Sequence, residues 1–343
     1  MRRSNQSMRN LLRRIFTPDG CATRAVRRIL PAADFFMTPF TWLASLWLCA
    51  IRMAGVKYFP FARRVFRSTG VFPIRDHYFE PMVNPAHLRL PLDQNRELPG
   101  IQLNIPAQLE RLAGFNFNDE LKRIPTDRVR PGEFFYNNPA FGSGDAEILY
   151  SFIRTVKPRR FIEVGCGYST LMARLAIEKN KAEDPSYDCE LICIEPYEAH
   201  WLEGLGIRVI RERLELLPLD FFQQLQKNDM LFIDSSHVIR PQGDVVREYL
   251  EILPSLRAGV YIHIHDIYTP KDYHPYVIIE EAYIWTEQYL LEALLTGNRD
   301  FTVVFSMYYL AHHHRAELLA KCPVLSQQTG NRMGASFWIQ KIA

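Results

Sequence analysis

The stretch Arg160-Phe-Ile-Glu-Val-Gly-Cys-Gly-Tyr-Ser169 joins an apolar run to a glycine-rich turn. Residues 160–164 are typical of a buried strand, and residues 169–179 of the helix that follows it. The glycines at 165 and 167 allow a tight turn and a close approach of the backbone to a ligand. A strand, such a turn and a helix in this order predict a ligand site at the carboxyl end of a parallel strand.

Strand-like and helix-like segments alternate outward from this turn, which predicts an α/β fold with a Rossmann-like, mostly parallel sheet. Seven strands are expected, at residues 160–164, 190–195, 208–210, 230–234, 260–264, 301–305 and 335–339. We place the catalytic domain at residues 133–343. Residues 71–132 are rich in proline and asparagine and predict an irregular connector that wraps this core. Residues 1–70 predict a basic, partly apolar helical extension, broken near residues 18–20, Pro31, Pro39 and Pro60.

Two acids near the turn indicate the ligand. Glu163 lies two residues before the first glycine, and the third glycine of a dinucleotide site is absent. A carboxylate there suits the cationic amino group of a methionine moiety, and Glu195, at the end of the next strand, can accept both ribose hydroxyls. The sequence therefore predicts S-adenosylmethionine (SAM) as cofactor, with contacts from Glu163, Gly165, Cys166, Gly167, Tyr168, Ser169, Glu195, Pro196 and Asp234.

Acids and histidines end the fourth and fifth strands, as Asp234-Ser-Ser-His237 and His263-Ile-His265-Asp266. The carboxyl ends of parallel strands line one crevice, so we expect these side chains to converge. An alcohol becomes a good nucleophile when its proton is removed, which makes His237 a candidate base together with Asp234. The residues expected to bind a divalent ion such as Mg²⁺ are Asp234, His265 and Asp266. His263 is expected to be a buried, hydrogen-bonded core residue.

Three segments, 161–169, 193–196 and 231–237, resemble the successive motifs of class I SAM-dependent methyltransferases, and more closely the bacterial methyltransferase-24 type. The resemblance covers about residues 133–343. Asp234, His237 and Asp266 are also similar to the metal ligands and base of O-methyltransferases that act on macrolide sugars. His265 stands where that pattern has an acid, so a softer ion and no ion are alternatives.

These features predict an enzyme that transfers a methyl group from SAM to a hydroxyl on a small molecule, a sugar or a lipid-linked metabolite. The alternatives are an RNA or protein methyltransferase that holds its substrate with the basic extension, and a non-catalytic SAM-binding protein associated with a membrane. No Asn-Pro-Pro-Tyr type motif of amine methylation follows the fourth strand. The sequence leaves the acceptor and the oligomeric state open.

The extension is the most basic part of the chain. Residues 1–67 contain 13 arginines or lysines and two acids, whereas the whole chain has a net charge of +3. Residues 35–51 carry no charge but include Phe35, Phe36, Trp42 and Trp47. We expect a helix packed on the protein or on an anionic membrane, with a core helix and a true span as alternatives. A nucleic-acid partner is not expected. The six cysteines form no disulfide or metal-finger spacing, which predicts a cytoplasmic protein. Together with the basic, apolar extension, this predicts a peripheral position at the inner face of the membrane.

Overall fold

The computed structural model describes residues 21–328 and 334–343, and the chain divides after His87 into two compact units. The first twenty residues of the basic extension lie outside the described residues. The predicted boundaries at residues 70 and 132 do not coincide with this division, and they stay predictions. Each unit is described by itself below.

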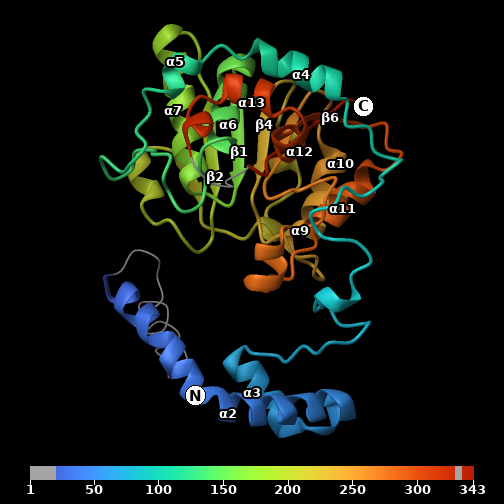
Figure 1. The fold of residues 1–343 in the computed structure, drawn as a ribbon. Helices are drawn as coiled ribbons and strands as arrows, with labels where there is room; N and C mark the ends of the chain where they lie inside the picture. Colours follow the sequence, from blue (N-terminus) through green and yellow to red (C-terminus); the bar gives the residue numbers. More distant parts are fainter. Residues whose placement is uncertain (1–20, 329–333) are drawn as a thin grey trace. The chain divides into compact units, whose positions relative to one another are not determined.

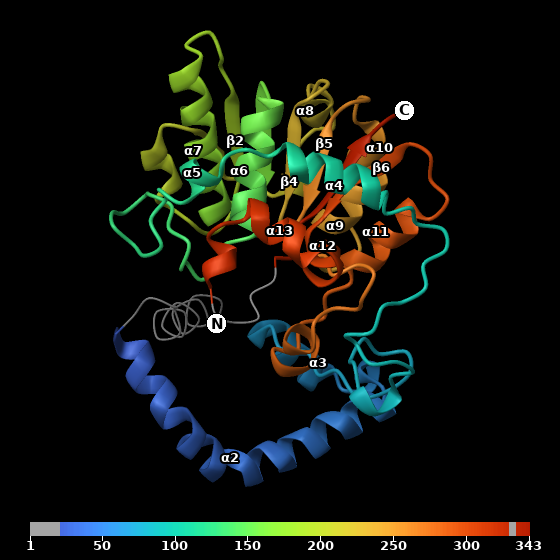
Figure 2. The same cartoon turned by 45° about the horizontal axis from the view of Figure 1, so that its top comes forward.

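The first unit is helical. Helix α2 (Cys21–Ala54) continues through Pro31 and Pro39, so the predicted breaks at these prolines are wrong. A proline removes one hydrogen bond and kinks a helix without having to end it, and Figure 2 shows α2 bending along its length. The further helical segments are η1 (Val56–Tyr58), α3 (Pro60–Thr69) and η2 (Pro85–His87).

The second unit contains a seven-stranded sheet with the order β3-β2-β1-β4-β5-β7-β6. Figure 1 labels β1, β2, β4 and β6 of this sheet. Adjacent strands from β3 to β5 are parallel, and β7 runs antiparallel to both β5 and β6. The fold prediction is therefore confirmed. The strands are β1 (Arg160–Val164), β2 (Glu190–Ile194), β3 (Arg208–Ile210), β4 (Met230–Ile233), β5 (Tyr261–Ile264), β6 (Phe301–Ser306) and β7 (Phe337–Lys341).

Alternate residues of the central strands β1 and β4 enter two separate hydrophobic layers, as the two-residue period of a strand requires. Phe161 and Phe232 pack in one layer with α4 (Ile105–Gly114), α6 (Asp145–Val156), α7 (Tyr168–Glu183), α12 (Met307–His313) and α13 (Arg315–Lys321). Ile162 and Ile233 pack in the other with α8 (Asp220–Gln223), α9 (Asp244–Arg247), η5 (Glu248–Ile252), α10 (Leu253–Ser255) and α11 (Glu287–Leu295). Short segments α5 (Asn118–Leu121), η3 (Leu202–Leu205), η4 (Leu214–Leu216) and η7 (Leu325–Gln327) complete the unit.

Two sequence expectations about helices are wrong. The pattern from residue 279 to 295 predicts one long helix, but the structure has a π-helical turn, η6 (Tyr276–Glu280), and then α11. The chain leaves the helix between them because the N–H groups of Thr286 and Glu287 donate to the carbonyl of His237, at 2.8 and 3.1 Å. The run His312-His-His314 lies in a polar stretch that predicts a solvated loop, but His312 and His313 are the last residues of helix α12, and His314 follows it.

Candidate functional site

The two glycines of the turn after β1 have different surroundings. Gly165 has a φ of +74°, and a Cβ built on it would lie 1.9 Å from the backbone oxygen of Asp234. Gly167 has no heavy atom within 4 Å of the same position. Gly165 is therefore required by the close approach of β1 and β4, whereas the open space beside Gly167 is available to a ligand.

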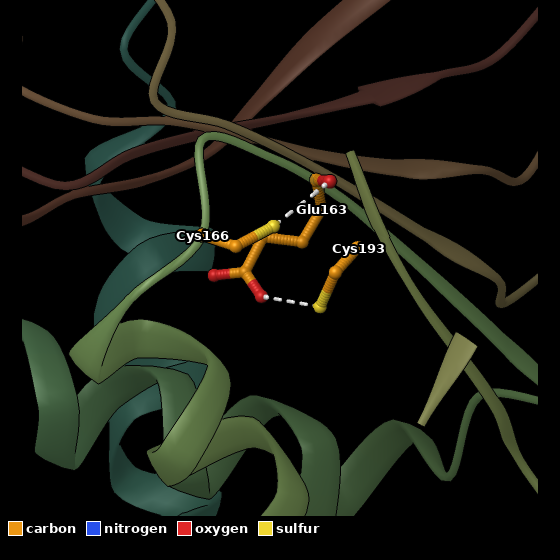
Figure 3. Close-up of side chains that lie close together, drawn as sticks. All are labelled: Glu163, Cys166 and Cys193. Atoms are coloured by element: carbon orange, nitrogen blue, oxygen red, sulfur yellow. Dashed lines mark hydrogen bonds between the residues drawn. The ribbon is translucent and has the colours of Figure 1, made fainter. Parts of the chain in front are cut away.

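Glu163 is fully buried below the turn and binds the start of α7. Its two carboxyl oxygens accept hydrogen bonds from the hydroxyls of Ser169 (2.5 Å) and Thr170 (2.6 Å). The Cys193 thiol lies 3.8 Å from the same carboxyl, and the Cys166 thiol donates to the Glu163 carbonyl at 3.5 Å (Figure 3). Burial raises the pKa of Glu163 to about 8 and that of Cys166 well above its ordinary value. These three side chains thus form a buried cluster in which the neutral forms of Glu163 and Cys166 are favoured, and the contact of Glu163 with a methionine moiety stays a prediction.

A cavity of about 310 Å³ opens at the ends of β1, β2 and β4. Glu195 is held there by the N–H groups of Tyr197 (2.9 Å) and Glu198 (2.8 Å), both on Oε1. Its Oε2 has one long hydrogen bond, from the Cys166 N–H at 3.4 Å, and can accept from a ligand hydroxyl. The predicted cofactor residues that line this cavity are Gly165, Glu195, Pro196 and Asp234, and those outside its lining are Glu163, Cys166, Gly167, Tyr168 and Ser169.

Three predicted site residues converge beside this cavity. The Nε2 atom of His237 lies 3.1 Å from Asp234 Oδ1 and 3.8 Å from Asp266 Oδ2. One ligand atom from each of the three side chains lies within 4.8 Å of the others. His237 and Asp266 both have positive φ, at 59° and 56°, which is costly for residues with a Cβ and recurs at functional sites.

Glu287, which the sequence reasoning missed, holds the other side of the His237 ring. Its Oε2 lies 2.7 Å from His237 Nδ1, and its Oε1 accepts the phenolic hydrogen of Tyr249 at 2.9 Å. Glu287 is fully buried, and the Trp285 ring lies 4.4 Å from the imidazole. Burial alone would lower the pKa of His237, but the hydrogen bonds and charges of Asp234 and Glu287 raise it well above its ordinary value. Glu287 begins helix α11, and acids at helix starts are commonly exposed to solvent, so the sequence alone does not show that this one contacts His237.

The two remaining histidines differ in their surroundings. The sequence predicts His265 as a metal ligand together with Asp234 and Asp266. In the structure His265 Nε2 lies 3.9 Å from Asp266 Oδ1, whereas the histidine that converges with both acids is His237. His263 is buried as expected, stacked 4.0 Å from the Phe232 ring. Its ring nitrogens have no hydrogen-bond partner within residues 21–328 and 334–343, contrary to the expected hydrogen bonding. Burial holds the pKa of His263 well below its ordinary value, so its ring is neutral.

A second cavity, of about 380 Å³, adjoins Asp266 and His265. Its wall carries hydroxyl, amide and carboxyl groups together with aromatic rings. The lining includes Asn138, Ser143, Asp145, Tyr268, His274, Tyr276 and Tyr308. The convergent acids and histidine therefore lie between two cavities, one at the glycine turn and one lined by polar and aromatic groups.

Comparison with known proteins agrees with this arrangement. Residues 162–267 match a family model described as a methyltransferase domain. An uncharacterized protein of Archaeoglobus fulgidus is 28 % identical over 178 residues, which cover 48 % of this chain and 78 % of the relative. The matched segment contains the turn after β1 and the ends of β2, β4 and β5, and together with the mostly parallel sheet it supports the predicted class I methyltransferase domain in the second unit.

Solved structures with a related arrangement are distant. An O-methyltransferase from Bacillus cereus, in complex with SAH, is 14 % identical, with 69 % of this chain and 91 % of that chain covered and a TM-score of 0.35. The O-methyltransferase TomG from Streptomyces achromogenes, in complex with SAM, is 15 % identical, with 68 % and 90 % covered and a TM-score of 0.35. The MycE methyltransferase of mycinamycin biosynthesis is 14 % identical, with 55 % and 47 % covered and a TM-score of 0.30.

Proposed function

We propose that the second unit transfers the methyl group of SAM to a hydroxyl of a small molecule, a sugar or a lipid-linked metabolite. One observation carries this proposal above the others. The His237 ring lies between the carboxyl groups of Glu287 and Asp234 at the sheet edge where the glycine turn ends, and the two acids next to its Nε2, Asp234 and Asp266, each line a different cavity. An imidazole held in this way is suited to removing a proton from a bound hydroxyl.

The donor would be held by the glycine turn and by the end of β2. Gly167 leaves open space for it, and Glu195 offers one oxygen to its ribose. SAM supplies an electrophilic methyl group on a sulfonium, which becomes the neutral thioether of S-adenosylhomocysteine (SAH) when an acceptor oxygen attacks the methyl carbon. Asp234 lines the donor cavity and contacts His237, so the methyl donor and the base share one wall.

His237 acts on the acceptor through Nε2. The Glu287 carboxyl accepts the Nδ1 proton and fixes the ring, so that Nε2 is the atom that exchanges a proton with the acceptor. Asp234 and Glu287 raise the pKa of His237 and favour the imidazolium, so the ring serves as the base after its Nε2 proton has left, and it is then a stronger base than a free imidazole. After transfer the proton stays on Nε2, where Asp234 and Glu287 stabilise the imidazolium charge.

The convergent carboxylates fit a hard divalent cation, because oxygen donors of Asp234 and Asp266 lie within 4.8 Å of each other and of His237. Asp234 and Asp266 would hold the ion, with His265 adjoining. Such an ion would supply positive charge that lowers the pKa of a bound hydroxyl. His237 then keeps its role as the proton acceptor.

The test measures methyl transfer from labelled SAM to a panel of sugar and lipid-linked hydroxyl compounds, alongside calorimetry with SAM, SAH and NAD. His237→Ala should lower kcat by about a hundredfold, as loss of a general base does, with SAM affinity nearly unchanged. The control is His313→Ala, which removes a histidine of α12. Tight NAD binding without SAM binding would end the proposal, and full activity of His237→Ala would end the assignment of the base. Activity that survives a chelator would exclude the role of the metal ion and leave the rest of the proposal in place.

A further inference from the structure

Helix α2 exposes large apolar side chains over most of its circumference. Eight of them between Phe35 and Trp47 keep 51–75 % of their surface exposed. An apolar surface of this extent is unusual on a protein that faces only water, and it indicates contact with lipid or with another protein. The eight residues are Phe35, Phe36, Met37, Phe40, Trp42, Leu43, Leu46 and Trp47.

One narrow stripe of α2 is polar. Asp34, Thr38, Thr41 and Ser45 follow each other at spacings of four, three and four, so they share one helix face. The hydroxyl of Thr38 donates to the Asp34 carbonyl at 2.9 Å, and that of Thr41 to the Met37 carbonyl at 3.2 Å. A helix with a broad apolar face and a narrow polar stripe is suited to lying in the plane of a membrane interface, with the stripe toward water.

Helix α3 adds positive charge beside apolar groups. Phe61 and Val65 are 81 % and 54 % exposed, and the same helix carries Arg63, Arg64 and Arg67, all exposed. From residue 28 to residue 67 the chain has six basic residues and one acid. Guanidinium groups bind phosphate oxygens in paired hydrogen bonds, so this charge complements anionic lipid headgroups.

Side-chain contacts fix the segment after α3 to the end of α2. Glu80 forms ion pairs with Arg52 and with Arg75, the latter at 3.5 Å. The rings of Phe66 and Phe72 meet edge to face with centroids 5.6 Å apart. These contacts present further exposed aromatic side chains, Phe72, Tyr78 and Phe79, on the same folded unit.

Within the described residues, the helical segment Arg28–Ala54 is long and apolar enough to cross a membrane. A core helix has similar length and composition, but only 6 % of the apolar window is buried here, which disfavours the core alternative of the sequence analysis. The polar stripe disfavours a span, because Asp34, Thr38, Thr41 and Ser45 would all face lipid. We propose that the first unit docks on anionic membranes, with α2 lying in the interface and the arginines of α3 on lipid phosphates.

The experiment is co-sedimentation of the full chain with vesicles of phosphatidylcholine alone or with one third phosphatidylglycerol. Strong pelleting is expected only with the anionic vesicles, and it should weaken as salt rises. Leu43→Glu places a charge on the apolar face and should lower vesicle affinity roughly tenfold or more, because a buried leucine contributes about that much. The matched control is Ser45→Glu, which adds the same charge on the polar stripe and should bind nearly as well.

Arg63→Gln with Arg64→Gln should reduce binding to anionic vesicles and leave the weak binding to phosphatidylcholine unchanged. Equal losses in Leu43→Glu and Ser45→Glu would overturn the in-plane arrangement. If the full chain does not pellet and Leu43→Glu instead turns an oligomer into a monomer, the apolar face binds a second copy and the proposal is wrong. SAM binding of all variants should equal that of the unmodified chain, so failure here is distinct from failure of the proposed catalysis.

Discussion

At the scale of single residues, Gly165 and Gly167 are constrained by different neighbours. From the sequence we expect a side chain at 165 to occupy the space of the ligand. The structure gives another cause, because that side chain would meet the backbone oxygen of Asp234 at the end of β4. Gly165 is therefore constrained by packing between β1 and β4, whereas we expect Gly167 to be constrained by the ligand.

Gly165→Ala should lower the free energy of unfolding by about 2–4 kcal/mol, because it combines a positive φ with a backbone clash. The free energy of unfolding of Gly167→Ala should lie within about 0.5 kcal/mol of that of the original chain, as is usual for mutations that cause no clash. It should nevertheless weaken SAM binding, since the new methyl group projects into the open space. Urea denaturation and calorimetry on both variants provide the comparison. A destabilised Gly167→Ala with normal SAM affinity would refute the distinction.

We propose that Glu287 positions the ring of His237 and does not itself reach the substrate. Glu287→Gln keeps the shape but loses the charge at Nδ1, so we expect kcat to fall about tenfold to a hundredfold with SAM affinity unchanged. Tyr249→Phe is the matched control, because it removes only the hydrogen bond to the far oxygen of Glu287. Its kcat should stay within about threefold of that of the original chain, because Tyr249 contacts Glu287 and not the His237 ring. Equal kcat for Glu287→Gln and the unmodified chain would exclude the role.

At the scale of elements, Glu163 joins strand β1 to the first turn of α7 and to Cys193 of β2. Both of its oxygens accept hydroxyl hydrogen bonds in a fully buried position. Burial disfavours the charged form, and this raises its pKa from the ordinary 4.5 to about 8. The junction is therefore assembled around a neutral carboxyl group.

This junction should make stability depend on pH. The unfolded chain releases the Glu163 proton above about pH 4.5, and the folded chain releases it only near pH 8. The free energy of unfolding therefore falls as the pH rises between these two values. The contribution of Glu163 should fall by about 1.4 kcal/mol per pH unit over that window and level off above pH 8. Glu163→Gln, which stays neutral, should lose this slope in urea denaturation between pH 5 and 8. Parallel stability curves for the two proteins would contradict the assignment.

The elements that the sequence predicted well are those whose pattern follows from their own burial. The strands of the sheet are short apolar runs covered on both faces, and their positions were predicted closely. Helix α2 was predicted to break because proline usually ends a helix, yet its exposed turns tolerate the lost hydrogen bonds. The break before α11 has no local signal, because it depends on hydrogen bonds to the distant His237 carbonyl.

The candidate site was partly predictable for a similar reason. Asp234, His237 and Asp266 end neighbouring parallel strands, so sheet topology alone brings them together. The inclusion of Glu287 depends on where the chain between β5 and β6 folds back. Alternation along β5 also could not show that the positive φ of Asp266 turns its side chain toward His237.

At the scale of the whole molecule, the two units divide the proposed tasks between them. The hydrophobic clusters of the described residues begin at Leu92, and the matched methyltransferase segment lies at residues 162–267. The exposed apolar helix and its arginines lie before residue 88. Donor binding and membrane docking should therefore be separable by cutting the chain between the units.

A truncated chain beginning at Leu88 should fold, bind SAH with the affinity of the full chain, and no longer pellet with anionic vesicles. Its core and its donor cavity are built from residues that it retains. Circular dichroism, calorimetry and co-sedimentation test the three expectations separately. A folded truncated chain whose SAH affinity falls more than tenfold would show that the first unit contributes to the donor site. Unchanged pelleting would instead place the lipid-binding surface on the second unit, and the exposed face of α2 would then need another occupant.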